Sequence, residues 1–355
     1  MQRTLELLNQ GIAEGLHPGY QICVIRGGET VVDHHAGEAR TGVPMTGDTL
    51  TLWMSAGKPI TAIAVAQQVS AGRVDLNTPV AEYIPDFGQG GKGTITVAHV
   101  LTHTSGFRKV GSNWSTEPWD KVIERMCAAE IEPGWVPGET AGYHVASGWY
   151  VLGEIVRRVD PRQRSLEVYL RDEVFEPMGM ADSWIGMPAS RYADYGTRVG
   201  MAWHTEKGET KPMPFPHTQL GCTLCRPGGN ARGPARELAR FYQQLLEDRT
   251  SDPVIRTFTQ HQRDGLKDLT FGAVLDWGYG FLMNDDRGKR LPYGYGPHAS
   301  PRTFGHSGNQ SSCAFADPQH DLAVAWVTNG LPGELAHQRR QHALNTAIYE
   351  DLAIS

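Results

Sequence analysis

Apolar residues recur at helical and strand spacings in the first third of this chain. In residues 2–15, Leu5, Leu8 and Ile12 share one side of a helix, so the pattern predicts a helix at the start. Residues 21–33 contain two apolar runs on either side of Gly27 and Gly28. Because glycine reaches the φ angles of a tight turn, this segment predicts a β-hairpin.

Residues 59–71 predict a helix of a different kind. Their Ala, Ile and Val residues cover nearly every side of the helix, and Gly72 follows it as a stop signal, so the helix should be buried. Further helical patterns occupy residues 119–129, 147–159, 166–175, 234–246 and 337–352.

Strand patterns return near the end of the chain. Residues 312–317 and 322–328 are apolar runs separated by a short polar turn, which predicts two paired strands. Strands at both ends around a helical middle predict an α+β fold with a helical insertion.

Composition and charge exclude several classes of protein. The chain has 355 residues, 40% of them hydrophobic and 20% charged, which is typical of a folded globular chain. Its net charge is −6 and it has no run of Lys and Arg, so we expect no nucleic-acid partner. Its apolar stretches are far shorter than the roughly 18 residues of a membrane span, so we expect no membrane partner.

The start of the chain and its cysteines both predict a cytoplasmic protein. The first residues lack the basic and apolar regions of a secretory leader. The five cysteines are an odd number, which fits free thiols in a reducing compartment. Cys222 and Cys225 form a CxxC pair without a second pair at zinc-ligand spacing, so we interpret them as ordinary thiols; a redox or metal site is the alternative.

Ser55 and Lys58 stand just before the predicted buried helix and have a spacing that suits nucleophilic catalysis. Residues three apart share one face of a helix, so the Lys58 amine can reach the Ser55 hydroxyl. Burial and the positive end of the helix both disfavour an ammonium and lower the pKa of lysine. The free backbone amide of Ser55 would be a donor to an oxyanion.

The surrounding motifs resemble those of the serine β-lactamases and penicillin-binding-protein-like hydrolases, specifically the class C β-lactamase and esterase family. After the serine and lysine, the motifs that carry the resemblance run in order through residues 69–80, 83–85, 95–107, 137–138, 143, 152–156, 235–241, 277–281 and 304–308. The resemblance implies a β-lactamase/transpeptidase-like fold, with an antiparallel sheet flanked by helices. It implies a single catalytic domain over residues 1–355, with a sheet part at about 1–80 and 235–355 and a mostly helical part at about 81–234.

The same resemblance implies roles for three catalytic residues. Ser55 matches the acylated nucleophile and Lys58 its activating partner. Tyr143 matches the tyrosine that takes the serine proton and returns a proton to the leaving group. Because a phenol has a pKa near 10, we expect a neighbouring cation such as Lys58 to lower the pKa of Tyr143.

A third motif matches His306, Ser307 and Gly308, which should lie on a strand at the edge of the site. The backbone amide of Asn309, which follows it, would be the second oxyanion donor beside Ser55.

Two positions depart from the β-lactamase pattern. Val145 stands where β-lactamases carry an Asn that contacts the substrate amide, and His306 stands where they carry a Lys. Valine forms no hydrogen bond, and histidine is mostly neutral at pH 7, so a permanent cation for a substrate carboxylate is missing. Both changes argue against an efficient β-lactamase or carboxypeptidase.

Several other residues are secondary candidates. His144, next to Tyr143, is a candidate substrate contact, whereas His103 is interpreted as a hydrogen-bonded turn residue. The glycine-rich residues 228–233 are expected to shape the site rather than to bind phosphate. One or two of four tryptophans are expected to line an apolar acyl pocket: Trp114, Trp119, Trp135 and Trp149.

The sequence therefore predicts a serine hydrolase that acts on carboxylic esters through a Ser55 acyl-enzyme, with no metal and no cofactor. The expected partner is a small-molecule acyl substrate, and the oligomeric state stays open. Three alternatives remain: an acyltransferase that passes the acyl group to an amine or alcohol, a weak β-lactamase or D-amino-acid peptidase, and a non-catalytic binding protein on the same fold.

Overall fold

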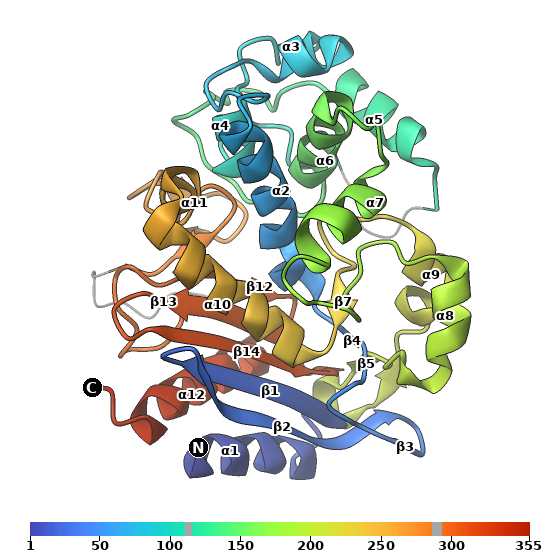
Figure 1. Ribbon diagram of the computed structural model, residues 1–355, viewed down its shortest axis with the longest axis vertical. Helices are drawn as coiled ribbons and strands as arrows, with labels where there is room; N and C mark the ends of the chain where they lie inside the picture. The colour runs from blue at the N-terminus through green and yellow to red at the C-terminus, as the bar shows by residue number, and fades with distance from the viewer. Residues whose placement is uncertain (111–115, 286–292) are drawn as a thin grey trace.

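An eight-stranded antiparallel sheet forms the centre of the computed structural model, which describes residues 1–110, 116–285 and 293–355 (Figure 1). The strand order is β10-β11-β12-β13-β14-β1-β2-β3. The strands are β1 (Gly19–Arg26), β2 (Glu29–Arg40), β3 (Val43–Pro44), β10 (Asp276–Trp277), β11 (Leu282–Met283), β12 (Phe304–Gly308), β13 (Ser312–Asp317) and β14 (Leu322–Thr328).

The two ends of the chain meet in the middle of this sheet. Strand β1 pairs with β14 from Tyr20 to Arg26, for example Ile22 with Trp326. The predicted hairpin is confirmed, because β1 turns into β2 through Gly27 and Gly28 with φ angles of 60° and 77°. The predicted strands at 312–317 and 322–328 are β13 and β14, which pair with each other.

Helices cover both faces of the sheet because its strands alternate between two apolar cores. Tyr20, Ile22 and Val24 face a core shared with α1 (Gln2–Ala13) and α12 (Glu334–Asp351). Cys23 and Ile25 face the opposite core, where α10 (Ala235–Ser251) crosses the sheet. The helices predicted at both ends of the chain and at 234–246 are therefore confirmed.

The helical region lies beside the sheet and is built around α2 (Lys58–Ser70), which packs against α6 (Ser147–Val159). Most residues of α2 are buried, as the apolar pattern predicts. The other helices are α3 (Val80–Tyr83), α4 (Val97–Leu101), α5 (Trp119–Ala128), α7 (Leu166–Leu170), α8 (Ala189–Tyr195), α9 (Gln219–Thr223) and α11 (Pro253–Phe258). Among the helices of these described segments, none is both long and apolar enough to span a bilayer.

The predicted helix at 166–175 changes its geometry halfway. It is α-helical in α7 and continues as a π-turn over Arg171–Phe175. Short strands also cross the region predicted as mostly helical. They are β5 (Trp203–His204), β6 (Lys211–Pro212) and β7 (Arg232–Gly233), and the remaining short strands elsewhere are β4 (Thr51–Leu52), β8 (Lys267–Asp268), β9 (Ala273–Val274) and β15 (Gly330–Leu331).

Candidate active site

Ser55 lies in a tight 3₁₀ turn, Met54–Gly57, that runs directly into α2. The turn begins with Met54 at a φ of 52°, an unusual value for a residue with a side chain. The turn packs against β12, and Ser312 Oγ donates a 2.7 Å hydrogen bond to the Trp53 carbonyl just before it. The serine is therefore held at the junction of the sheet and the helical region.

Lys58 is fully buried and is within hydrogen-bonding distance of Ser55. Its Nζ lies 2.9 Å from Ser55 Oγ and also donates to the Gly228 carbonyl. The glycine-rich loop reaches this position because β7, at its end, pairs with β4 just before the serine turn. Burial lowers the pKa of Lys58 well below its usual range, since water no longer solvates the ammonium. A neutral Lys58 amine can donate to Gly228 and accept the Ser55 proton.

Tyr143 faces the same pair of residues. Its ring centroid lies 5.2 Å from Lys58 Nζ, and its hydroxyl group is near enough to Ser55 to interact with it. The pKa of Tyr143 is raised, because the effect of burial outweighs the opposite effect of Ser55. The expectation that Lys58 lowers this pKa is therefore wrong. Lys58 is itself buried, and burial disfavours the ammonium charge that would be needed to lower the pKa of Tyr143. Tyr143 is held as a phenol that can give up a proton to a stronger base.

Long-range contacts hold the Tyr143 backbone in place. The buried Asp268 carboxylate accepts a 3.1 Å hydrogen bond from the Tyr143 amide, and Thr270 Oγ1 donates to the Tyr143 carbonyl at 3.1 Å. Arg263 lies 3.5 Å from the other oxygen of Asp268. No sequence motif marks these supports, because Asp268 is a lone carboxylate more than 100 residues from Tyr143.

His306 and Ser307 line the site from β12. His306 Nδ1 donates to the Ser307 carbonyl at 2.8 Å, so Nε2 is left as an acceptor, and it has no partner among the described residues. Burial is the main cause that lowers the pKa of His306, to about 3. The expected absence of a cation at this position is thus consistent with the structure.

The predicted oxyanion donors come from two elements. Ser55 and Asn309 both line the same pocket, and within the described chain neither backbone amide is hydrogen-bonded to another element. Gly308 does not line the pocket. A side chain there would overlap the Trp53 carbonyl and come within 3.0 Å of Met54 Cβ, so this glycine allows the serine turn to approach β12.

His144 does not line the pocket, although its neighbour Tyr143 does. It is fully buried, and its two ring nitrogens lie 2.9 Å from Ser147 Oγ and 3.2 Å from Ser105 Oγ. The predicted substrate contact of His144 is therefore not supported. His103 has a φ of 59° and accepts a hydrogen bond from the His144 amide, as expected of a turn residue.

The pocket beside Ser55 has a volume of about 190 Å³ and a largely apolar wall. Its described lining contains no Lys, Arg, Asp or Glu. The lining residues are Ser55, Tyr143, Val145, Thr270, Phe271, Leu275, Trp277, Leu282, Tyr293, His306, Ser307 and Asn309.

The aromatic wall differs from the prediction. Trp119, Trp135 and Trp149 do not line the pocket, and Trp114 lies outside the described residues. Trp277 takes the predicted place of an apolar wall, and its ring centroid lies 5.8 Å from that of Tyr143. Trp149 lies behind the site, with its ring centroid 5.7 Å from Lys58 Nζ, but it does not reach the pocket wall. Trp277 does, because it stands on β10 at the edge of the sheet.

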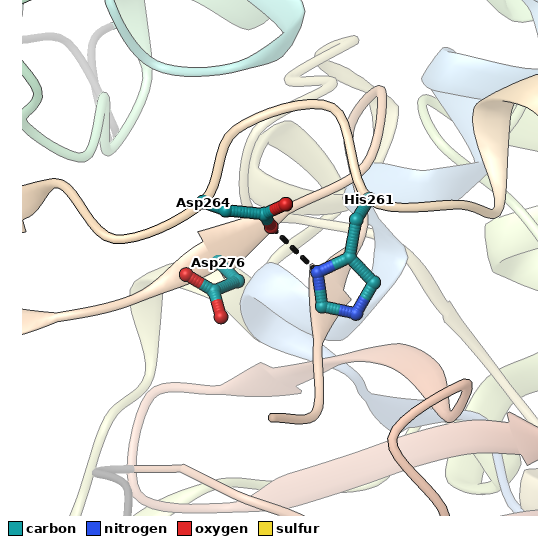
Figure 2. A group of neighbouring side chains, drawn as sticks. All are labelled: His261, Asp264 and Asp276. Carbon is teal, nitrogen blue, oxygen red and sulfur yellow. Dashed lines mark hydrogen bonds and ion pairs between the residues drawn. The ribbon is translucent and has the colours of Figure 1, made fainter. Parts of the chain in front are cut away.

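The candidate thiol and metal groups lie outside this pocket. Burial raises the pKa of both Cys222 and Cys225, which disfavours the thiolate form that metals and redox chemistry require. Figure 2 shows His261 beside Asp264 and Asp276, a set with donor atoms close enough for a metal ion. His261 Nδ1 lies 2.6 Å from Asp264 Oδ1, and its Nε2 lies 3.1 Å from the Pro301 carbonyl. Both ring nitrogens of His261 therefore already have partners within the protein.

Comparison with known proteins identifies the family of this chain. A profile of the Beta-lactamase family matches residues 6–348. The chain is 28% identical over 366 residues to Esterase/beta-lactamase LipL of Mycobacterium tuberculosis, covering 93% of this chain and 81% of the relative. It is 25% identical to Esterase EstB of Burkholderia gladioli, covering 97% of this chain and 93% of that esterase.

A solved structure of a family VIII carboxylesterase superimposes with a TM-score of 0.77 at 27% identity, covering 97% of this chain and 96% of that one. The predicted β-lactamase/transpeptidase-like fold is therefore confirmed. Because the family profile also spans nearly the whole chain, this protein is a member of the Beta-lactamase family.

Proposed function

We propose that this protein hydrolyses carboxylic esters through an acyl-enzyme formed on Ser55. The observation that carries the proposal is the contact of Ser55 with both a buried amine and a phenol at the mouth of an uncharged pocket. Relatives that are named esterases support the same reaction class. The chemistry requires no metal and no cofactor.

The first step forms the acyl-enzyme. Neutral Lys58 takes the Ser55 proton across the 2.9 Å contact while Ser55 Oγ bonds to the carbonyl carbon of the ester. The backbone amides of Ser55 and Asn309 stabilise the oxyanion. Tyr143 gives its proton to the departing alkoxide, and the Lys58 ammonium returns a proton to the Tyr143 phenolate.

The second step releases the acid. Water attacks the acyl carbon, Lys58 takes a proton from that water, and the bond to Ser55 Oγ breaks. The proton on Lys58 returns to Ser55, so the net reaction consumes one ester and one water and yields one acid and one alcohol. An acyl transfer would follow the same path with an alcohol or amine in place of water.

The pocket favours uncharged substrates. Burial disfavours a positive charge on Lys58 and on His306, and Val145 offers no hydrogen bond, so a substrate carboxylate would lie in an apolar pocket without a partner. Each missing hydrogen bond to a charged group costs about 1.5–3 kcal/mol, or roughly 10–150-fold in rate. We therefore infer a preference for neutral esters over β-lactams.

The test of the nucleophile uses Ser55→Ala. This variant should fold normally and keep less than about 1% of the turnover, because it lacks only the attacking oxygen. Intact-protein mass spectrometry after exposure to an activated ester should show one acyl group on the wild type and none on Ser55→Ala. An acyl group that persists on Ser55→Ala would contradict the proposal.

The substrate preference is tested by comparing kcat/KM for a short-chain p-nitrophenyl ester and a chromogenic cephalosporin. We expect the ester value to be higher by about 10²–10⁴ if the two missing contacts add. A cephalosporin value equal to or above the ester value would contradict the preference. Product analysis with an added alcohol or amine separates hydrolysis from acyl transfer.

We also propose a cytoplasmic location and a small-molecule ester as the partner. All five cysteines are free, which supports a reducing compartment. The small uncharged pocket supports a small acyl substrate.

A further inference from the structure

A second cavity lies at the opposite end of β12 from the serine turn. It has a volume of about 570 Å³ and is formed where the end of α10, helix α11 and the segment before β12 meet. Its described lining includes three arginines and no Asp or Glu. The lining residues are Arg249, Thr250, Arg256, Thr259, Gln260, His261, Met283 and Arg302.

This cavity is separate from the Ser55 pocket. Met283 of β11 lines the arginine cavity, whereas its neighbour Leu282 lines the Ser55 pocket. Because successive side chains of a strand point to opposite faces, the two cavities open on opposite sides of the sheet. Among the described lining residues, none belongs to both cavities.

The three arginines carry charges that the described protein does not neutralise. None of them forms a salt bridge with a described residue, although the chain has more acidic than basic residues overall. Arg249 Nε is buried without a partner in the described residues, and the guanidinium lies over the Phe304 ring at 5.4 Å. Arg256 donates to the Arg249 carbonyl at 3.1 Å, while Arg302 is exposed.

The arginines also repel one another. Burial and the positive charges of Arg302 and Arg256 together lower the pKa of Arg249. Asp264 and Asp276, the two carboxylates beside His261 in Figure 2, are not among the residues that line the cavity. Like charges gathered without a counter-charge destabilise a fold, and a bound anion removes that cost.

We propose that this cavity binds a phosphate-bearing small molecule. Guanidinium groups match phosphate oxygens with paired hydrogen bonds, and several guanidiniums around one cavity suit a dianion better than a carboxylate. The volume falls within the roughly 300–1,000 Å³ of small-molecule sites. Arg249 supplies a half-buried charge at the wall, and the exposed Arg302 can close on the ligand from the solvent side.

The test measures thermal unfolding and calorimetric binding with inorganic phosphate and with pyrophosphate, at an ionic strength held constant with sodium chloride. We expect a saturable rise of Tm with both phosphates and none with chloride alone. Arg249→Gln and Arg302→Gln should each weaken phosphate binding at least about tenfold, the loss expected for one charge-assisted hydrogen bond. Arg339→Gln, which removes an exposed arginine of α12, is the matched control and should bind as the wild type does.

The sign of the stability change distinguishes binding from a structural role. In buffer without phosphate, Arg302→Gln should leave Tm unchanged or raise it, because repulsion falls. Ester hydrolysis should stay at the wild-type level in all three variants, which reports that they fold. An equal response to chloride and phosphate, or a full phosphate response in both Arg249→Gln and Arg302→Gln, would overturn the proposal.

Discussion

Lys58 is the residue whose charge state determines the mechanism we propose. A buried ammonium costs far more free energy than a buried amine unless a carboxylate accompanies it. Among the described residues, Lys58 contacts a hydroxyl and a carbonyl, and no carboxylate pairs with it. The amine is therefore the stable form, and it is also the form that can accept the Ser55 proton.

The first prediction concerns the pH profile of kcat/KM for a neutral ester. The rate should rise with pH through the lowered pKa of Lys58, because the base must be unprotonated. It should fall again only above the usual tyrosine range near pH 10, because Tyr143 acts as a phenol and its pKa is raised. Histidine should contribute no inflection near pH 6.5, since the pKa of His306 is about 3.

The control for this profile is His306→Asn, measured from pH 5 to 10. Its acidic limb should match that of the wild type, because the titrating group is Lys58. An acidic limb that disappears in His306→Asn would identify His306 as the base instead.

Tyr143→Phe is predicted to fold normally and to lose roughly 10²–10⁴-fold in kcat, the usual contribution of a general acid or base. The ring packing against Trp277 stays intact in this variant, since only the hydroxyl is lost. Circular dichroism and Tm provide the check on folding. A loss below tenfold would show that another group protonates the leaving alkoxide.

The serine turn and β12 form one unit, and their close approach depends on a glycine. Gly308 lies against Trp53 and Met54, so the turn carrying Ser55 and the strand carrying His306 are in backbone contact. This contact brings the amides of Ser55 and Asn309 to the same pocket.

We predict that Gly308→Ala separates these two elements. The added methyl group must push the turn away, at a cost of about 1–3 kcal/mol in stability, and kcat should fall because the oxyanion donors move apart. Gly93→Ala is the matched control: its methyl group meets only an ordinary contact at 3.6 Å, so activity and stability should stay near wild type. Equal kinetic effects in the two variants would contradict this account.

The segment from Asp268 to Trp277 supports the site from outside its motifs. It supplies the carboxylate that holds the Tyr143 amide and three apolar residues of the pocket wall. A substitution such as Asp268→Ala therefore acts on Tyr143 through the backbone, without touching the substrate.

Buried neutral histidines make the whole molecule sensitive to acid. Burial is the first cause of a lowered pKa in each of them, and several lie beside arginines that lower it further. They are His17, His103, His144, His217, His306 and His337.

We predict a steep loss of stability as the pH falls from 6.5 toward 3. The unfolded chain binds protons at these histidines before the folded chain does, so acid favours unfolding. For each of His17, His144 and His306, with a folded pKa of about 3, the loss at pH 5 is about 2 kcal/mol. Their sum, about 6 kcal/mol, is comparable with the total stability of about 5–15 kcal/mol for a typical protein.

Urea unfolding at pH 7.5, 6 and 5 tests this prediction. The free energy of unfolding should fall with decreasing pH, and His17→Gln should show a shallower fall than the wild type. His204→Gln removes an exposed histidine and should keep the wild-type slope. A free energy that is constant from pH 7.5 to 5 would contradict the neutral state of the buried histidines.

The sequence by itself determined the features that depend on near neighbours in the chain. The hairpin at Gly27 and Gly28, the buried α2 and the spacing of Ser55 and Lys58 are set by turn chemistry and by a period of 3.6 or 2 residues. The order of motifs along the chain likewise indicates the family. Such local rules need no knowledge of what a segment packs against.

Only the tertiary structure determines which side chains are shielded from water and therefore disfavour a charge. His144 follows Tyr143 in sequence, yet its ring nitrogens contact Ser105 and Ser147, whereas the Tyr143 side chain lines the pocket. The raised pKa of Tyr143 and the pocket wall at Trp277 depend on elements that meet only in the folded chain. Burial is a sum over contacts that are distant in sequence, so the protonation states that we assign to the site could be derived only from the fold.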